Sequence, residues 1–260
     1  MGLQVVRFAI CRRFSIAVVA ALFVGLVSGA NATEDLTKGE RAYRAGDYPT
    51  AVQELEPYAR AGNARAQYLL GYMYDFGSSS LHPAFARDEE KAIYWLDLAV
   101  AQSYPPAMGH RAGIYVGTAR NRSDLEKGLA LLTKAAEAGD VESQVSLGIQ
   151  LGVISHLRFG IEKDPKRAVY WLTRAAQAGW RDYSELAFVT CGEVEASGNR
   201  DVLVTCFSWL LVAMSDGGDD QAEKWYRQLR PRVTADDIAE ATRRADDWLA
   251  RYPPRKFPPD

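Results

Sequence analysis

The side chains best suited to acid–base or metal chemistry are few and scattered along this sequence. The three histidines, His82, His110 and His156, stand 28 and 46 residues apart, and no His-Glu-x-x-His or Cys-x-x-Cys pattern occurs. Zinc sites draw their ligands from closely spaced histidines and cysteines, so this scatter predicts no metal site. We expect His82 and His156 to be solvated residues of loops between helices.

The motifs of nucleophilic and cofactor-dependent catalysis are also missing from the sequence. It contains no Gly-x-Ser-x-Gly nucleophile elbow, no glycine-rich phosphate loop and no Gly-x-Gly-x-x-Gly fingerprint. Acidic residues are plentiful, but they stand mostly at expected helix starts and on polar faces, so no acid–base pair can be singled out. We therefore predict no catalytic residue and no cofactor, and we expect the protein not to be an enzyme.

The overall composition indicates a folded chain without affinity for nucleic acid. Of the 260 residues, 48% are hydrophobic and 25% are charged, and the formal net charge is −2. Binding to a phosphate backbone draws on an excess of positive charge that releases counterions. No such excess is present, so nucleic acid is not an expected partner.

Residues 1–32 are expected to be a secretory signal peptide that is cleaved after Ala32. Three arginines precede an apolar segment at 14–27, and Ala30-Asn31-Ala32 has the small residues of a cleavage site. The alternative is a membrane anchor, but the segment extended to Ala30 has 17 residues, and a span needs about 20. Cleavage removes three arginines and no acid, which changes the net charge from −2 to −5. We expect a periplasmic protein that meets a membrane only through a partner.

A repeated helical pattern runs through the rest of the chain. Five leucines separated by 41, 36, 40 and 38 residues each lie among apolar residues spaced as one face of an α-helix. They are Leu55, Leu96, Leu132, Leu172 and Leu210. In three copies a tryptophan precedes the leucine, and we expect these residues, Trp95, Trp171 and Trp209, to be core.

The predicted helix ends recur in the same register. Seven residues after each leucine comes a glycine, or in one copy a serine, and glycine suits a left-handed helix stop. These residues are Gly62, Ser103, Gly139, Gly179 and Gly217. Eight residues before the first four leucines stand aspartates that can cap a helix start, namely Asp47, Asp88, Asp124 and Asp164, and the last copy has Asp201 beside that position.

A second helix is expected in each unit, ahead of the leucine helix. Gly71 and Gly148 each lie nine residues past a stop glycine, among apolar residues at helical spacing. A glycine inside a helix costs about 1 kcal/mol relative to alanine, so its recurrence predicts close packing between helices. Each unit is then a helical hairpin of roughly 40 residues, which must stack on its neighbours to bury its apolar face.

This pattern resembles the Sel1-like repeat, a relative of the tetratricopeptide repeat. The best copy is formed by Ala66, Leu70, Gly71, Tyr74, Gly77, Asp88, Lys91, Ala92, Trp95, Leu96 and Ala99. A second good copy runs from Leu147 to Gly179. The copy between them departs from the pattern, because Arg111-Ala112 replaces Leu-Gly, and the copy around Cys191 departs further.

The expected fold is an all-α, right-handed α-solenoid of about five helix-turn-helix repeats. Residues 33–62 are predicted to form a tetratricopeptide-like hairpin and residues 63–217 the Sel1-like repeats. Residues 218–252 are predicted to form capping helices, the last of which begins with a capping box at Thr234. Residues 253–260, which are rich in proline, are expected to be disordered.

Cys191 and Cys206 are the two cysteines that remain after cleavage. An even number of cysteines in an oxidising compartment favours a disulfide, and the alternative is two buried thiols. In the repeat register we place Cys191 at the position of Tyr74 and Cys206 at that of Ala92, which should face each other. The bridge would close a loop of about 16 residues and add roughly 3 kcal/mol to stability.

The resemblance implies that the first helices of the hairpins line a concave groove that binds a partner protein or peptide. In tetratricopeptide-like stacks the groove positions lie three residues before, and one and four after, the small packing residue. These are Tyr68, Tyr72, Asp75, Val145, Ile149, Gly152, Glu185 and Val189, together with Gly109, Gly113 and Val116 in the copy that contains Arg111-Ala112. Apolar residues in a groove are typical of protein-binding sites. The alternative is that the register is off by one and some of them are core.

A second candidate contact is the loop at 153–163, which is rich in apolar residues and must fold back onto the stack or meet a partner.

We therefore expect a non-enzymatic periplasmic scaffold or adaptor that binds a partner protein, in its sharper form a regulator of an envelope sensor. One alternative is a cell-wall-directed enzyme of the β-lactamase or peptidoglycan-hydrolase type, which would need clustered catalytic groups. The other is a scaffold for exopolysaccharide export, which is disfavoured because no cysteine for lipid attachment follows the apolar segment. The partner and the oligomeric state stay open.

Overall fold

The structure, a computed structural model, describes residues 36–77, 85–154, 159–215 and 220–253. The described residues form helices and connecting turns without a β-strand, so the predicted all-α fold is confirmed. The predicted signal peptide, the stop glycine at 217, the tail at 254–260, and His82 and His156 lie outside the described residues. Within the described part, no helix has both the length and the apolar character needed to cross a membrane.

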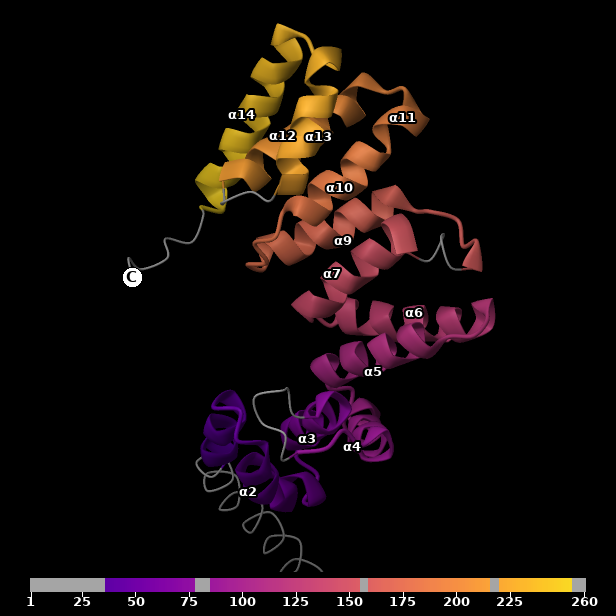
Figure 1. The fold of residues 1–260 in the computed structure, drawn as a ribbon, viewed down its shortest axis with the longest axis vertical. Helices are drawn as coiled ribbons and strands as arrows, with labels where there is room; N and C mark the ends of the chain where they lie inside the picture. The colour runs from indigo at the N-terminus through magenta and orange to yellow at the C-terminus, as the bar shows by residue number, and fades with distance from the viewer. Residues whose placement is uncertain (1–35, 78–84, 155–158, 216–219, 254–260) are drawn as a thin grey trace, which may run out of the picture. The chain divides into compact units, whose positions relative to one another are not determined.

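The chain divides into two compact units, residues 1–99 and 100–260. In the first, helical residues 36–44 precede α2 (Tyr48–Arg60), α3 (Ala64–Phe76) and α4 (Glu89–Ala101), whose last two residues pass the boundary (Figure 1). The core of this unit includes Leu55, Leu70, Met73 and Trp95.

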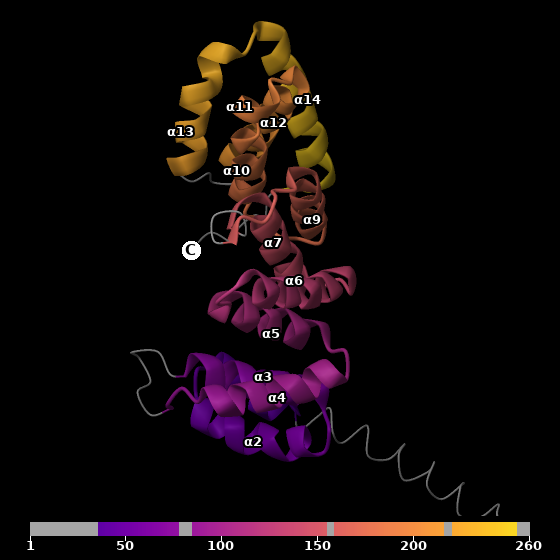
Figure 2. The ribbon, with the colours of Figure 1, turned by 90° about the vertical axis from the view of Figure 1, so that its right-hand side faces the viewer.

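The second unit contains the remaining helices. They are α5 (Pro105–Thr118), α6 (Arg122–Glu137), α7 (Val141–Ile149), the π-helical turn η1 (Gln150–Ile154), α9 (Pro165–Gln177), α10 (Ser184–Gly192), α11 (Val194–Ser197), α12 (Arg200–Ser215), α13 (Asp220–Leu229), the 3₁₀ turn η2 (Arg230–Arg232) and α14 (Ala235–Arg251). From α5 through α6, α7, α9 and α10 to α12, each long helix packs on the next one (Figure 2). α13 and α14 then pack on α12, and α14 starts with the predicted capping box at Thr234.

The helix stops agree with the sequence prediction wherever they are described. Gly62, Gly139 and Gly179 have φ angles of 95°, 93° and 104°, and Ser103 takes the same left-handed region at 58°. Glycine enters this region without the clash of a Cβ atom, which explains why it recurs at the end of these helices.

Three of the four predicted aspartate caps are confirmed. The carboxylates of Asp47, Asp88 and Asp164 accept hydrogen bonds from backbone N–H groups three residues later, at 3.0–3.2 Å. The prediction for Asp124 is wrong, because α6 begins earlier and Asn121 is its cap, accepting from the Asp124 N–H at 2.9 Å. The cap of α6 therefore lies three residues before the predicted position, because the helix is longer at its start.

The close approach of the two helices of a hairpin explains the recurring glycines. A Cβ atom on Gly71 would lie 2.6 Å from Leu96 Cγ and 3.2 Å from the Ala92 carbonyl oxygen. On Gly148 it would lie 2.6 Å from Leu172 Cγ and 3.1 Å from the Ala168 oxygen. The two repeats therefore share one packing geometry in which the leucine side chain occupies the space that a side chain on the glycine would need.

A buried glutamine links each of these two hairpins to the helix before it. Gln67 Nε2 donates to the Ala59 carbonyl oxygen at 2.9 Å, and Gln144 Nε2 donates to the Ala136 oxygen at 3.1 Å. Both acceptors belong to the last turn of the preceding helix, where carbonyl groups lack partners within the helix. This link between successive repeats was not predicted from the sequence.

The glycine packing gives a test of the fold. We expect Gly148→Ala to lower the free energy of unfolding by about 1–3 kcal/mol, because the new Cβ collides with Leu172 and with backbone. We expect Gly113→Ala to raise it by up to about 1 kcal/mol, because nothing lies within 4 Å of a Cβ atom at that helical position. Urea denaturation followed by circular dichroism measures both changes. An equal effect of the two substitutions would contradict the packing.

Candidate functional site

The close-packing residue of each first helix sets the register of its exposed positions. We use this term for the residue at which the first helix of a hairpin comes nearest to the second. It is the eighth residue of each first helix, namely Gly71 in α3, Ala112 in α5, Gly148 in α7 and Cys191 in α10. In the first three repeats one residue separates the stop from the helix start, whereas α10 starts at Ser184, after 180–183. Because of these three extra residues, the sequence register that placed Cys191 at the position of Tyr74 is wrong.

The exposed side of α3 carries a row of aromatic side chains, which we call the aromatic row: Tyr68, Tyr72 and Phe76. The ring centroids of Tyr68 and Tyr72 lie 6.2 Å apart, and those of Tyr72 and Phe76 lie 4.6 Å apart. Phe76 is 59% exposed. The predicted groove residues Tyr68 and Tyr72 are thus partly accessible and stand together.

Asp75, the third groove residue predicted on α3, lies beside this row. Its carboxylate accepts a hydrogen bond from Arg87 Nη2 at 3.1 Å, and its backbone oxygen accepts one from Arg87 Nε at 2.7 Å. These contacts fix the segment that leads into α4, so they give Asp75 a structural role in the first unit.

The groove prediction is wrong for Val145 on α7. Val145 is buried in the apolar cluster that also contains Leu172 and Leu186, and Ile149 is half-buried against the same cluster. The exposed side of α7 is displaced by one position, so that Ser146 is exposed there. This is the off-by-one register that the sequence left open.

The prediction is also wrong for Val189 on α10. Val189 is buried, and a Cβ atom on Gly152 would lie 2.9 Å from its Cγ2, while Glu185 is half-buried. Because three residues are inserted before α10, the equivalent groove positions are Phe188 and Gly192. Phe188 is 42% exposed and contacts Trp225 edge-on, with 6.5 Å between ring centroids.

A cavity of about 300 Å³ lies between α5, α6 and α7. It is lined by Gly109, Gly113, Val116, Gly117, Leu132, Ser146 and Gln150. Gly109, Gly113 and Val116 are the groove positions predicted for this repeat, so the structure brings the three of them together at one hollow.

The apolar segment after η1 folds back onto the second unit where it is described. Phe159 and Ile161 pack against the buried cluster of Val116, Ala119 and Leu125. This contact accounts for the apolar character of Phe159 and Ile161.

Cys191 and Cys206 form a disulfide, as predicted. The two Cα atoms lie 4.9 Å apart, and both residues are buried. Because Cys191 takes the close-packing position and Cys206 that of Ala92, the covalent bond joins α10 to α12 where Gly71 approaches the Ala92 backbone in the first Sel1-like copy. We assign the bridge a structural role.

The repeated tryptophans are core residues in two of three cases. Trp95 and Trp171 are buried, whereas Trp209 is half-buried. The Trp209 ring stacks on Tyr183 at 6.4 Å and meets Trp248 of α14 edge-on at 4.9 Å. Trp209 therefore packs the capping helix onto the last hairpin.

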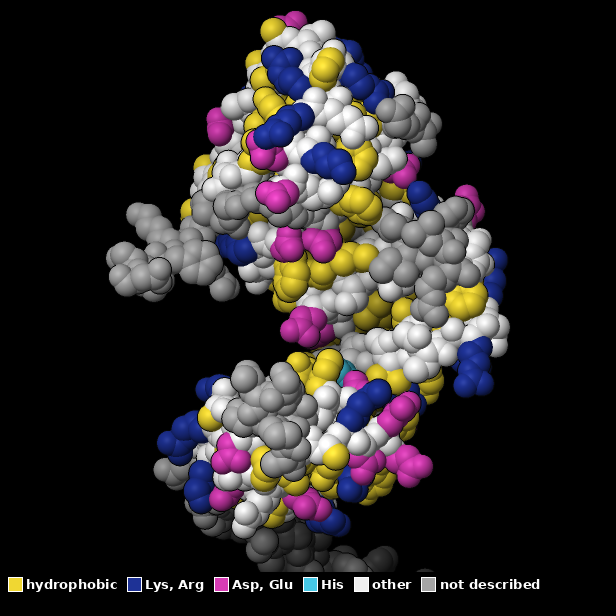
Figure 3. Space-filling view, in the orientation of Figure 1, with side chains coloured by type: hydrophobic (Ala, Val, Ile, Leu, Met, Phe, Trp, Pro, Cys, Tyr) yellow, Lys and Arg dark blue, Asp and Glu magenta, His cyan; other side chains and the backbone are white. Residues whose placement is uncertain are grey.

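The charged side chains form ion pairs rather than a reactive cluster. Figure 3 shows acidic and basic groups interspersed over the visible face, and within the described residues no group of three or more His, Cys, Asp or Glu is arranged to hold a metal ion. His110 lies half-buried on α5.

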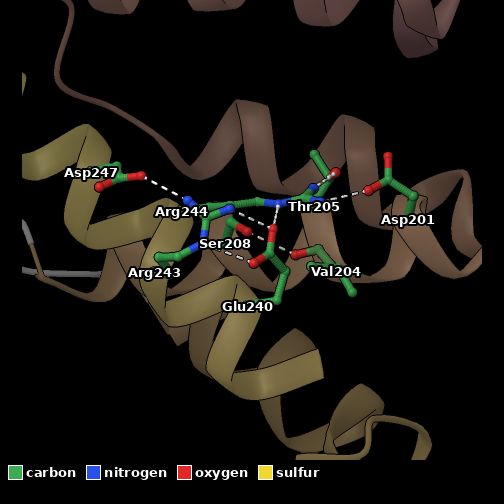
Figure 4. A network of polar contacts seen from close by, with 8 residues as sticks. All are labelled: Asp201, Val204, Thr205, Ser208, Glu240, Arg243, Arg244 and Asp247. Atoms are coloured by element: carbon green, nitrogen blue, oxygen red, sulfur yellow. Dashed lines mark hydrogen bonds and ion pairs between the residues drawn. The ribbon is translucent and has the colours of Figure 1, made fainter. Parts of the chain in front are cut away.

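The densest polar network joins α14 to α12 (Figure 4). Arg244 donates to Asp201 and Glu240, both at 2.7 Å, and Arg243 donates to Glu240 at 2.8 Å. The hydrogen bonds from Arg243 and then Arg244 lower the pKa of Glu240 to about 2. The network attaches the last helix, α14, to α12 of the stack.

A fold of stacked helical hairpins defines the protein as an α-solenoid, and the comparisons with known proteins specify its repeats. The Sel1 repeat family matches residues 64–104, 108–140 and 141–180. The chain therefore contains three Sel1 repeats, including the central copy that departs from the pattern at Arg111-Ala112.

Two crystal structures are similar to this chain in fold. One is a protective antigen present in uropathogenic Escherichia coli strains that displays an SLR fold, with a TM-score of 0.70 and 20% identity over 89% of this chain and 48% of that chain. The other is a Sel1 repeat protein from Oxalobacter formigenes, with a TM-score of 0.55 and 19% identity over 83% of this chain and 98% of that chain. The chain thus spans about half the length of the antigen. No curated protein matches it.

The disulfide gives a stability prediction. We expect the double substitution Cys191→Ala/Cys206→Ala to lower the free energy of unfolding by about 3 kcal/mol, because it frees a loop whose ends are 15 residues apart. Guanidinium denaturation with and without reductant measures this. Reductant should destabilise the parent and leave the double variant unchanged, and two free thiols in the denatured, unreduced chain from residue 33 would contradict the bridge.

The α12–α14 network gives a prediction about pH. Because the pKa of Glu240 is lowered in the folded state, its ion pairs stabilise the protein above the ordinary value near 4.5 and are lost as the pH falls toward about 2. We expect Glu240→Gln to reduce stability at pH 7 and to flatten the loss of stability between these two values. Thermal unfolding over a pH series measures this, with Asp246→Asn as the control outside the network. The same acid profile in both variants would refute the role of Glu240.

Proposed function

We propose that this protein is a non-enzymatic periplasmic adaptor that holds a partner protein against the exposed side of its first helices. Sel1-repeat proteins are generally protein-interaction scaffolds, and this fold is typically non-enzymatic. The periplasmic location is supported by the sequence pattern of residues 1–32 and by the disulfide, since disulfides persist in oxidising compartments.

The observation that carries the proposal is the exposure of large aromatic side chains on first helices of both units. Phe76 is 59% exposed on α3, and Phe188 is 42% exposed on α10. Phe188 stands three residues before Cys191, which is a groove position, and Phe76 follows the groove position Asp75 on the first helix of its own hairpin. Exposed aromatic residues at positions set by the architecture are typical of sites where a partner removes them from water.

Two exposed tyrosines lie on second helices, and their ring contact, unlike those of Phe76 and Phe188, is the same in two repeats. Tyr94 is 57% exposed and Tyr170 is 53% exposed. Each ring lies edge-on to the adjacent tryptophan, with 4.9 Å between centroids in both repeats. The same intramolecular contact in two repeats gives these tyrosines a packing role and makes them suitable controls.

The form of the proposal that we favour is an adaptor for the periplasmic part of a membrane sensor. A chain that is released from its signal peptide can diffuse to the sensor, and binding can then change the activity of the sensor. The sequence pattern that supports this release is the short apolar segment at 14–27.

The test is quantitative cross-linking and capture from the periplasmic fraction of the native host. We expect the captured protein to start at residue 33 and to retain one partner in fixed proportion. Phe76→Ala combined with Tyr72→Ala should weaken capture of that partner about tenfold or more, as should Phe188→Ala, because each removes aromatic contact area.

The matched controls are Tyr94→Ala and Tyr170→Ala, which remove similar rings from second helices of the same units. Equal loss in the controls and the groove variants would show that capture does not use the first helices. Recovery outside the periplasm would refute the location, and turnover of cell-wall fragments by the pure protein would refute the non-enzymatic role.

A further inference from the structure

The second helices α4 and α9 share one internal framework. Each has 13 residues, follows a capping aspartate and carries Tyr-Trp-Leu at the same positions. In both helices the tyrosine ring lies edge-on to the tryptophan, with 4.9 Å between centroids. The basic residue three positions after the cap forms an ion pair with the capping aspartate in both, namely Lys91 and Arg167. The contacts that these helices make within their own repeats therefore correspond.

The charges that the two helices carry on this framework are opposite. Residues 88–99 include four acidic residues and one basic residue, a formal charge of −3. The equivalent residues 164–175 include one acidic and three basic residues, a formal charge of +2. Because the capping aspartate and its basic partner are present in both segments, the difference in sign comes from the other charged positions.

Those other charges lie on one side of each helix, around the shared tyrosine. On α4, Glu90 and Asp97 are exposed and stand four residues before and three after the tyrosine. On α9, Lys166 is exposed and Arg174 is half-buried, and they stand four residues before and four after it. Residues at these spacings share a helix face. We call the two sets, each with its tyrosine, the acidic face of α4 and the basic face of α9.

Helix stability explains the acidic face but not the basic one. The partial positive charge of a helix N-terminus favours acids such as Glu90 in the first turn and disfavours cations there. Lys166 nevertheless stands in the first turn of α9, which contains no acidic residue. Within the described residues neither Lys166 nor Glu90 forms an ion pair. Each face thus presents a charge that no contact inside the chain uses.

We propose that the basic face of α9 binds the acidic face of α4 in a second copy of this chain. The faces come from equivalent helices, so the tyrosine of one copy can meet that of the other with cations opposite acids on both sides of it. Contact between two identical faces is disfavoured, because like charges would meet. The contact is therefore heterologous. This proposal goes beyond the adaptor function and does not depend on it.

The contact is expected to be weak and sensitive to salt, because exposed ion pairs are screened and each contributes little. The test uses the chain from residue 33 with its disulfide intact, followed by sedimentation velocity over a series of protein concentrations. We expect reversible association at about 0.01 M salt and its loss at about 1 M, where the screening length falls from about 30 Å to about 3 Å. A monomer at every concentration, or association that does not respond to salt, would overturn the proposal.

Charge reversal then identifies the two faces. Glu90→Lys alone and Lys166→Glu alone should each weaken association about fivefold or more, because like charges then meet across the contact. An equimolar mixture of the two variants should associate again, since the first keeps a native basic face and the second a native acidic face. A variant that associates as tightly as the parent, or a mixture that shows no recovery, would contradict a contact between α4 and α9.

The matched controls make the same charge changes away from both faces. Glu137→Lys on α6 and Lys224→Glu on α13 alter exposed residues that form no ion pair in the part of the chain that the structure describes. Both should associate like the parent, and all four variants should keep its circular dichroism spectrum. Equal loss in the controls would assign the effect to net charge and overturn the proposal.

A different occupant of the basic face would overturn it as well. That result would be a monomeric chain that binds vesicles of anionic lipid and loses this binding in Lys166→Glu. The envelope capture described above decides the adaptor function separately, because it depends on aromatic residues of the first helices and not on these charges.

Discussion

Two helices of a hairpin meet at one small residue, and the rest of each repeat is arranged around that contact. Gly71 lies under Leu96 and Gly148 under Leu172, each so close that no side chain fits between the helices. Gly39 approaches Leu55 in the same way, because a Cβ atom on Gly39 would lie 2.5 Å from Leu55 Cγ. The distance between the helices at this point fixes which residues face the core, and therefore which positions of the first helix face outward.

The repeat around Cys191 shows how the same contact is kept when the sequence changes. The leucine of this repeat, Leu210, is kept and buried, but no glycine stands at the crossing, and a disulfide from Cys191 to Cys206 holds the helices at a Cα distance of 4.9 Å. Because the bond occupies the position of the glycine, the outward positions of α10 follow by the same count as in α3. Phe188 then corresponds to Tyr68, although its neighbours in sequence bear no likeness to those of Tyr68.

The sequence was sufficient for the fold because its strongest features are local. A stop glycine, a capping aspartate and a face of apolar residues act over one or two helical turns, so Gly62, Asp88 and Leu96 could be placed without knowledge of their neighbours in space. The groove was less predictable, because it depends on a count across a loop. The three residues inserted before α10 shift the groove positions from Glu185 and Val189 to Phe188 and Gly192. Val145 packs into the core beside α9 and α10, and no residue of its own helix indicates this contact. The cavity on α5 was within reach of the sequence through its unusual glycines.

Gln67 and Gln144 have a consequence for how the preceding helices tolerate substitution. Each amide donates to a carbonyl in the last turn of the helix before it, and this backbone acceptor is present whatever side chain stands there. At these two joints the polar link is thus neutral and independent of the side chain that carries the acceptor. A substitution at Ala59 or Ala136 would change the packing there but would leave the acceptor of the link in place.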